Sequence, residues 1–414
     1  MGAQPHATRK YDQLSLHIQR AQAPNQPYQV RCVSRGQPTV YGPLGDSTIT
    51  IADIQALQRR YERQQHLARE LASAGMPTPP PDEQPLLAIG RHVAELLPTD
   101  VRQTLIIALQ RARRKRHGLR VVLEIAADAP ALLGIPWELL ALPLDWANEA
   151  ESFVFLTADT TLVRQIHGLG HFAPLELARP LQLQAFAATP RDAQPIDLQA
   201  TQAAIPSNRT AAQWYAGPNT LEALQERLRS TNPQIVHLLC HGEQCDTGMG
   251  LPRYDLLLTH ADGNTQRVTA IDLARVLSLA PALQVVLLQS CYSGAVAVSG
   301  AAQQQAVASI ALALIRAGVP LVIAMQGEVA QSSAEAFVRA CYATLAQGGC
   351  VGQAVAAGRI AMRSAGGIAD WSLPVIYQGN QPQEQMGWLA RLSSSFGQWW
   401  QPAPLQTAMR VSSR

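Results

Sequence analysis

Two residues in the second half of the chain have side chains capable of covalent chemistry, and each follows an apolar run. Cys291 ends the segment QVVLLQSC, and His241 stands near the end of QIVHLLCHG, 50 positions earlier. A thiolate is a strong nucleophile, and a nearby imidazole can accept the thiol proton or lower the thiol pKa. The two residue types therefore predict a thiol–imidazole pair, provided that the fold brings the two segments together.

The segments around these residues alternate between strand-like and helix-like patterns. Strand patterns occupy 181–189, 234–242, 284–291 and 320–326, and helical stretches between them occupy 219–230, 269–280 and 306–318. This alternation predicts an α/β fold with a parallel or mostly parallel sheet flanked by helices. Functional residues of such sheets gather at the carboxyl ends of the strands, so we expect His241 and Cys291 at the ends of neighbouring strands.

Small residues around the pair complete the predicted site. Gly242 has no side chain to keep backbone and substrate apart. Its N–H and that of Cys291 together could form an oxyanion hole for the charge that develops on an attacked amide carbonyl. Ser293 and Gly294 keep the loop after the nucleophile small. Taken alone, Cys291 would be interpreted as a buried small hydrophobe, and a lone His at a strand end as structural; the joint pattern favours chemistry.

The first half of the chain has a different texture. Residues 1–27 are polar and rich in Gln and Pro, so we expect a loosely ordered lead-in. A strand pair at 28–42, a long helix at 50–75 with a Thr50–Asp53 capping box, and two helices around Pro98 follow. The predicted division is a lead-in (1–27), an N-terminal mixed helical and strand region with a supporting or regulatory role (28–180), the domain with the candidate site (181–380) and an aromatic-containing C-terminal tail (381–414).

Composition excludes several classes of protein. The chain has 414 residues, 47% of them hydrophobic, and a net charge of +3, so no global field favours nucleic acid or a membrane surface. Six cysteines without Cys-x-x-Cys spacing indicate neither a disulfide scaffold nor a zinc site, and we expect no metal and no cofactor. No apolar run is long enough to span a bilayer, and reduced cysteines favour a cytoplasmic location.

Two further segments have alternative interpretations. The basic run at 111–117 is interpreted as the last turn of a helix before Gly118, where cations suit the helix dipole, in preference to a direct nucleic-acid contact. The tail carries four large aromatic residues, which either dock back on the domain or expose a surface to a partner: Trp388, Phe396, Trp399 and Trp400.

These segments together resemble the CHAT domains, bacterial members of the caspase–separase superfamily. VHLLCHG resembles the family's His segment, TAIDLARVLSLAPALQVVLLQSC its helix and Cys strand, and LLGIPWELL the segment upstream of its protease half. SCYSG is also similar to the Ser-Cys-His-Ser-Gly of metacaspases, and a His about 50 residues before the Cys is typical of caspases. The resemblance covers about 119–380 and implies a caspase-like fold.

The resemblance implies a cysteine endopeptidase with a Cys–His dyad, in which Cys291 is the nucleophile and His241 the general base and acid. It implies a role in bacterial antiviral defence or regulated cell death, with a protein substrate and with activity kept off until a partner or ligand rearranges the loops. The alternative is a catalytically silent, protease-like scaffold, which would have no need of both His241 and Cys291. An α/β-hydrolase is disfavoured, because the Gly-x-Ser-x-Gly elbow is missing from the expected context.

Substrate specificity is less clearly marked. Metacaspases carry an Asp two residues before the nucleophile, which helps to bind a basic P1 side chain, whereas this chain has Gln289. Caspases carry Gln at this position but recognise Asp mainly through arginines whose counterparts we do not identify. The remaining candidates for an acidic substrate pocket are Glu243, Asp246 and Glu328.

Overall fold

The computed structural model describes residues 10–21, 27–45, 50–78, 82–127, 129–144, 153–166, 172, 174–206, 210–215, 220–245, 253–299 and 306–379. Asp246 and the tail at 381–414 lie outside these residues, so neither the Asp246 candidate nor the two alternatives for the tail can be placed. No helix within the described ranges is long and apolar enough to cross a membrane.

The first half of the chain mixes strands, helices and two 3-10 turns. In chain order these are β1 (Tyr11–Arg20), β2 (Tyr28–Ser34), β3 (Val40–Leu44), α1 (Ile51–Ser73), α2 (Gln84–Glu95), α3 (Thr99–Arg114), β4 (Gly118–Ile125), η1 (Pro130–Gly134), η2 (Trp137–Leu139) and β5 (Thr160–Ile166).

The second half alternates strands and helices as predicted. Its elements are β6 (Leu181–Ala187), α4 (Leu198–Ala204), β7 (Thr210–Trp214), α5 (Leu221–Thr231), β8 (Ile235–Leu239), β9 (His241–Cys245), β10 (Arg253–Thr259), β11 (Thr265–Val268), α6 (Ala270–Leu277), β12 (Val285–Gln289), β13 (Ala297–Ser299), β14 (Ala306–Ala308), α7 (Ile310–Arg316), β15 (Leu321–Met325), α8 (Gln331–Ala346), α9 (Val351–Ser364) and β16 (Pro374–Gln378).

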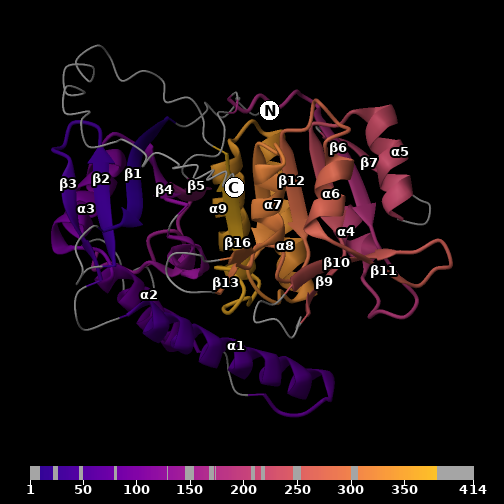
Figure 1. Ribbon diagram of the computed structural model, residues 1–414, viewed down its shortest axis with the longest axis horizontal. Helices are drawn as coiled ribbons and strands as arrows, with labels where there is room; N and C mark the ends of the chain where they lie inside the picture. The colour runs from indigo at the N-terminus through magenta and orange to yellow at the C-terminus, as the bar shows by residue number, and fades with distance from the viewer. Residues whose placement is uncertain are drawn as a thin grey trace, which may run out of the picture.

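One large sheet runs through both halves of the described molecule (Figure 1). Its strand order is β3-β2-β1-β4-β5-β16-β15-β12-β8-β6-β7. β6, β8, β12 and β15 pair in parallel in one part of it, and β1, β4 and β5 pair in parallel in another. β16 lies antiparallel to β15. The predicted α/β fold with a mostly parallel sheet is therefore confirmed.

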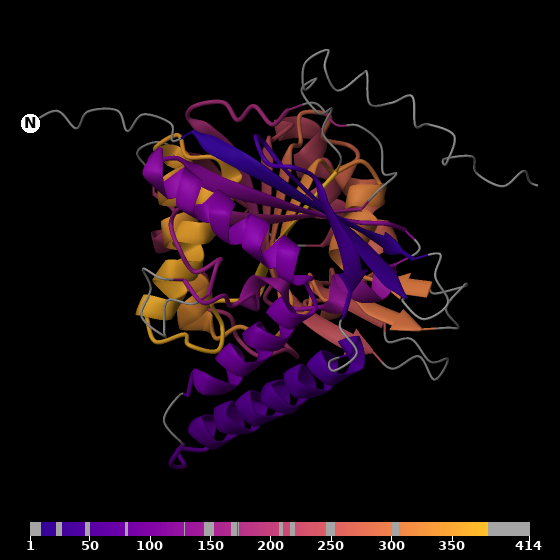
Figure 2. The same cartoon turned by 90° about the vertical axis from the view of Figure 1, so that its left-hand side faces the viewer.

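Helices cover both faces of this sheet. α5, α6 and α7 pack in succession against one another, while α4, α8 and α9 form a second group. Figure 2, which turns the molecule by 90°, places the yellow helices of the second group on one side of the strands and the orange α7 on the other. The strands between the two layers are almost continuously apolar, because both of their faces are buried.

The expected lead-in at 1–27 is wrong for the residues that the structure describes there. Residues 11–20 form β1, which pairs with β2 on one side and with β4 on the other. Leu14, Leu16 and Ile18 alternate with polar residues and are buried. This period of two is the pattern of a strand with one buried face. The strand was not predicted because Gln and other polar residues surround the alternating apolar ones.

α1 is a long helix that projects from the body, below β9 and β13 in the view of Figure 1. The predicted capping box is present, because the Thr50 hydroxyl accepts from the Asp53 N–H at 3.2 Å and Asp53 accepts from the Thr50 N–H at 2.9 Å. Ile54 and Tyr61 are its buried residues. The basic run ends α3 as predicted, with three arginines in the last turn.

A buried ionic cluster joins the first half of the chain to the second. Glu138 and Arg164 form a fully buried ion pair, and Arg359 of α9 approaches the same carboxylate at 3.6 Å. Trp137 is buried beside them and donates its indole N–H to the Leu132 carbonyl oxygen at 2.8 Å. The IPWE segment therefore has a structural role: it anchors the 3-10 turns to β5 and α9.

Candidate active site

The two chemically capable residues follow neighbouring strands, as expected. β8 and β12 pair in parallel register, with Leu239 beside Gln289 at their last positions. The Cys240 N–H continues this contact by donating to the Gln289 carbonyl oxygen at 3.3 Å. His241 comes two residues after Leu239, and Cys291 comes two residues after Gln289. The fold therefore brings His241 and Cys291 to the same edge of the sheet.

The sequence predicted a single strand at 234–242, and this prediction is wrong. β8 ends at Leu239, and His241 begins β9, which pairs antiparallel with β10 in a separate three-stranded sheet. His241 lies opposite Leu257, and Gly242 lies opposite Leu256. The break after Leu239 lets β9 leave the large sheet and pass the loop of Cys291, so His241 belongs to a different sheet from the strand that precedes it.

Gly242 is the point where β9 touches the loop of Cys291. A Cβ atom on Gly242 would lie 1.9 Å from the Cys291 carbonyl oxygen and 2.6 Å from the Ser290 hydroxyl. A residue with a side chain would have to move backbone atoms here. The sequence analysis gave this glycine a role in approaching substrate; the close approach in the structure is to the backbone of Cys291.

The loop after Cys291 is small and firmly held. The Ser293 hydroxyl donates to the Ser290 carbonyl oxygen at 2.8 Å and accepts from the Met325 N–H at 3.1 Å. The Gly294 N–H donates to the Met325 carbonyl oxygen at 2.7 Å. Tyr292 adopts a left-handed backbone conformation, with φ +58°. These contacts fix the turn that carries Cys291 against the end of β15.

His241 is oriented by the loop that follows β6. Its Nε2 lies 2.7 Å from the carbonyl oxygen of Gln194. A carbonyl can only accept, so Nε2 carries the proton, and Nδ1 is left as the basic nitrogen of a neutral ring. No hydrogen bond joins His241 to Cys291 within the described part of the chain.

The Cys291 thiol is partly exposed, and its surroundings favour the protonated form. Burial raises the pKa of Cys291, and the carboxylates of Glu328 and Asp370 add to this effect. The Val329 N–H, which hydrogen-bonds to the sulfur, and the Arg69 guanidinium oppose it. The net shift is upward, so Cys291 is mainly a thiol at neutral pH in this conformation.

Glu328 follows β15 and is held by α1. His66 Nδ1 lies 3.2 Å from Glu328 Oε2, and Arg69 Nη1 lies 3.4 Å from the same oxygen. Arg69 also binds Asp370 at 2.6 Å, and the Tyr292 hydroxyl donates to Glu328 at 3.2 Å. Although burial opposes the change, these partners lower the pKa of Glu328. This pocket candidate thus lies beside the residue after Cys291, and its charge is already paired.

Gln289 lies inside the sheet. Its side chain is buried, and its Oε1 accepts from Nε2 of His237 at 3.0 Å. His237 is fully buried between the rings of Trp214 and Tyr342, and burial lowers the pKa of His237 to about 4, so it is neutral at pH 7. The side chain of Gln289 thus points into the core, where it contacts a neutral histidine.

Glu243 lies two residues after His241 and on the same face of β9, since side chains alternate along a strand. Its carboxylate pairs with Arg267 of β11 at 2.8 Å.

Cys240 is buried, and burial raises its pKa to about 12. Within the described ranges no group of three or more His, Cys, Asp or Glu residues is arranged to hold a metal ion.

The comparison with known families decides the membership of this chain. The model of the CHAT domain matches residues 88–389, which is more than half of the sequence. The chain belongs to the CHAT domain family. The matched region begins in α2, contains the segments of His241 and Cys291, and extends past β16.

Solved structures resemble this CHAT protein only distantly. Two crystal structures of the separase–securin complex from Saccharomyces cerevisiae, at 2.6 and 3.0 Å resolution, align with 89% of this chain and 30% of the other chain, at 9% and 12% identity with TM-scores of 0.48 and 0.45. A secreted C11 cysteine protease from Bacteroides thetaiotaomicron with an irreversible peptide inhibitor aligns with 43% of this chain and 56% of that chain, at 11% identity and TM-score 0.27. No curated protein matches the chain.

The CHAT protein spans less than a third of the separase chain with which it aligns. At these identities none of the three structures assigns residue roles to this chain.

Sequence reasoning missed two groups of residues around the site of this CHAT domain. His237 stands in the middle of an apolar run, where a polar residue needs a buried partner, and this was a readable signal. His66 and Arg69 of α1 are about 220 positions from Cys291 and stand among other polar residues of an exposed helix. Their pairing with Glu328 depends on the tertiary placement of α1, which no local pattern indicates.

Proposed function

We propose that this CHAT protein is a cysteine endopeptidase in which Cys291 is the nucleophile and His241 the general base and acid. The observation that carries the proposal is the packing of His241-Gly242 against the backbone of Cys291, at the ends of β8 and β12. A thiol and an imidazole on adjacent segments of one sheet edge suit nucleophilic attack on an amide. Family membership supports the same reaction class.

The reaction balances within these groups. The Cys291 thiol gives its proton to Nδ1 of His241, and the sulfur forms a bond to the substrate carbonyl carbon. The N–H groups of Cys291 and Gly242 are the candidates to hold the resulting oxyanion. The imidazolium then protonates the leaving amine, and the C–N bond breaks to give a thioester. Water, deprotonated by His241, releases the carboxylate product and restores the thiol.

The described conformation supports an enzyme that is held off. Burial and the nearby carboxylates of Glu328 and Asp370 raise the pKa of Cys291 and keep the thiol protonated, and His241 is engaged with Gln194. Turnover requires the Cys291 sulfur and the His241 ring to approach each other. We infer that a partner protein or ligand brings about this rearrangement, and that the N-terminal region takes part through α1, whose Arg69 acts on Cys291.

Specificity resides in the loop that follows β15, and Glu328 is its main determinant. Glu328 is one-third exposed and hydrogen-bonds to Tyr292, the residue after the nucleophile. The inward direction of Gln289 and the pairing of Glu243 with Arg267 give these two candidates weaker support. A basic P1 side chain would pair with Glu328, and it would have to replace His66 and Arg69 of α1.

The biological role that fits a switchable protease of this family is bacterial antiviral defence or regulated cell death in the cytoplasm. The substrate would then be a protein whose cleavage is lethal or protective, and the trigger would come from another molecule.

The alternative is a silent scaffold, and one observation favours it: Cys291 and His241 are not hydrogen-bonded within the described residues. Catalytic hydrogen bonds are often long before substrate binds, so the separation in this conformation is compatible with an enzyme.

The test compares new protein N-termini in a bacterial lysate incubated with the wild-type protein, with Cys291→Ala and with Cys245→Ser. A peptidase generates a defined set of N-termini with wild type and Cys245→Ser and none with Cys291→Ala. Cleavage that persists in Cys291→Ala would refute the assignment of the nucleophile. The absence of any set of N-termini that depends on Cys291, in this lysate and in lysate of virus-infected cells as a source of the trigger, would favour the scaffold.

A further inference from the structure

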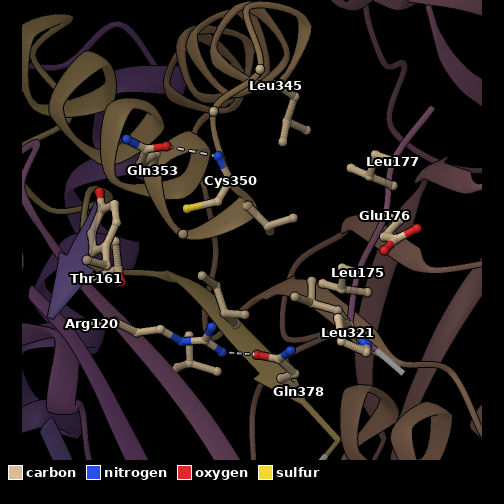
Figure 3. Close-up of a pocket in the computed structure, with 18 of the residues that line it drawn as sticks. Arg120, Thr161, Leu175, Glu176, Leu177, Leu321, Leu345, Cys350, Gln353 and Gln378 are labelled. Carbon is tan, nitrogen blue, oxygen red and sulfur yellow. Dashed lines mark hydrogen bonds between the residues drawn. The ribbon is translucent and has the colours of Figure 1, made fainter. Parts of the chain in front are cut away.

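A large cavity lies at the end of the sheet away from Cys291 (Figure 3). Its volume is about 690 Å³, which is in the range of pockets that hold small molecules. Leu321, the first residue of β15, and Gln378, the last residue of β16, pair with each other and line it. Cys291 follows the opposite end of β12, which is parallel to β15. The cavity is therefore separate from the candidate active site.

Aliphatic side chains form a large part of the wall of this cavity. Leu175 and Leu177 come from the connection between β5 and β6, Leu321 and Ile376 from the sheet, and Leu345 from the end of α8. Figure 3 shows Leu175, Leu177 and Leu345 around the same open space. Such walls favour an apolar ligand body, and they offer little aromatic surface for stacking.

The wall formed by the β5–β6 connection is held in place by two glutamines. The Glu176 N–H donates to Gln284 Oε1 at 2.7 Å, and the Ala178 N–H donates to Gln234 Oε1 at 2.7 Å. Both glutamines also donate to the Glu176 carbonyl oxygen, at 2.9 and 3.1 Å. The cavity is thus largely preformed, and a ligand would not have to order this wall.

Arg120 of β4 brings a positive charge to one side of the cavity. Its Nη2 donates to the Gln378 side-chain oxygen, as Figure 3 shows. Its Nε is buried and has no hydrogen-bond acceptor among the described residues. Burial lowers the pKa of Arg120, and no carboxylate among the described residues forms an ion pair with it. A half-buried guanidinium without a carboxylate partner is costly, and an anion bound here would offset that cost.

The first turn of α9 lies next to Arg120 on the cavity wall. The capping box uses the N–H groups of Cys350 and Gln353. The N–H groups of Val351 and Gly352 have no acceptor within the helix, and the start of this 14-residue helix carries a partial positive charge. Glu176 stands on the facing wall in Figure 3, so negative charge is disfavoured there.

We propose that this cavity binds a small amphiphilic anion, with an aliphatic body between the leucine walls and a carboxylate or phosphate head at Arg120 and the first turn of α9. The charges set the orientation: Arg120 and the first turn of α9 lie on one side, and Glu176 lies on the facing wall. Arg179 also lines the cavity, and its guanidinium reaches Gly348, just before α9. The site is independent of the proposed peptidase reaction and can be tested without it.

Cys350 provides a local readout. Its thiol is exposed and lines the cavity, whereas Cys245 on β9 is a partly exposed thiol outside the cavity lining. Sodium decanoate below its micelle concentration is expected to slow alkylation of Cys350 by iodoacetamide at least tenfold and to leave Cys245 unchanged, as measured by peptide mass spectrometry on the full chain. Decyl phosphate tests the phosphate head, and decanol and decyltrimethylammonium keep the chain without the negative charge.

Two variants, Arg120→Gln and Leu177→Trp, test the proposal independently, so the test survives if one of them fails to fold. Arg120→Gln should weaken decanoate binding by about 10- to 100-fold, because a charge-assisted contact is lost. Arg316→Gln, at the end of α7, is the matched control and should bind normally. Leu177→Trp should fill the cavity and abolish protection. From octanoate to dodecanoate, affinity should rise roughly tenfold for each two methylenes buried.

Protection of Cys350 by decanoate or decyl phosphate that is lost in Arg120→Gln and in Leu177→Trp would support the site, and the stronger of the two probes would identify the head group. Equal protection by decanol would refute the anionic part of the proposal. The whole proposal would be overturned if neither anionic probe protected Cys350 at millimolar concentration, or if both variants bound like the wild type.

Discussion

At the scale of single residues, the contact between Gly242 and Cys291 is the closest link between the two halves of the candidate dyad. The 1.9 Å separation between a built Cβ and the Cys291 carbonyl oxygen leaves no room for a methyl group. The same backbone places one N–H of the proposed oxyanion hole. The glycine therefore sets both the packing of the loop and the geometry of the site.

Gly242→Ala should accordingly harm stability and activity together. Overpacking against backbone costs about 1–3 kcal/mol, so we expect the free energy of unfolding to fall by this amount. Labelling or turnover at Cys291 should fall more than tenfold, because the loop must move. Chemical denaturation and peptide hydrolysis measure the two effects. Gly134→Ala is the control, since its Cβ would meet its nearest neighbour at an ordinary 3.4 Å.

The pair His241 and Cys291 could be proposed from sequence because both follow apolar runs that had to be adjacent strands. The pocket residues could not. A role in the substrate pocket depends on the direction of a side chain, and the sequence does not reveal this direction for Gln289 or Glu328. The structure turns Gln289 inward to His237 and ties Glu328 to α1. Side-chain direction in loops depends on partners from remote segments, which spacing does not reveal.

At the scale of elements, α1 is one of the parts of the N-terminal region that reach the site, together with α2 and η2. Two of its residues are buried, and its polar contacts to the second half run through Arg69 and His66. The partners of Arg69 are Glu328 and Asp370, and Asp370 is nearly fully buried. A buried carboxylate that loses its cation is left uncompensated.

Arg69→Gln should therefore loosen α1. We expect a loss of about 1–3 kcal/mol in the free energy of unfolding and faster proteolysis within α1. A double-mutant cycle with Asp370→Asn should show strong coupling, because the second change removes the same ion pair. Arg60→Gln, an exposed position of the same helix, is the control and should be neutral. Additive effects of the two changes at 69 and 370 would contradict this account of α1.

At the scale of the whole molecule, one sheet runs through both halves of the chain. A titratable side chain buried in this sheet, His237 of β8, makes the free energy of unfolding depend on pH. His237 is fully buried and neutral, because burial lowers its pKa to about 4 from an unfolded value near 6.5. Between these values the unfolded chain binds one more proton than the folded chain. The stabilisation is thus complete above pH 6.5 and is lost as pH falls towards 4.

This difference predicts that His237 accounts for about 3 kcal/mol of the stability lost between pH 6.5 and 4. His237→Gln should be less stable than wild type at pH 7, because it loses ring packing against Tyr342 and Trp214. Its free energy of unfolding should fall less steeply over this pH range. Denaturant titrations at several pH values measure the two slopes. Equal slopes would mean that His237 is not buried as a neutral ring.

Most of the fold could be predicted from the sequence, because buried parallel strands and capped helices leave strong local patterns. α1 with its Thr50–Asp53 cap and α6 with its Thr269 cap are examples. β1 was missed because its alternation lies in polar surroundings, and the break between β8 and β9 was missed because VHLLCHG reads as one run. The joining of both halves into one sheet depends on long-range pairing, which a single sequence does not show.

The most direct test of the central claim is labelling by peptidyl acyloxymethyl ketones that carry basic, acidic or aliphatic P1 residues, with the site mapped by mass spectrometry. In the presence of cell extract as a source of the trigger, the account predicts one adduct at Cys291 in the wild type and in Cys245→Ser. It predicts no adduct in Cys291→Ala, and labelling at least 100-fold slower in His241→Gln. Labelling of Cys291 that is equally fast without the His241 imidazole, or no labelling of Cys291 by any of the ketones, would contradict a Cys–His dyad in this CHAT protein.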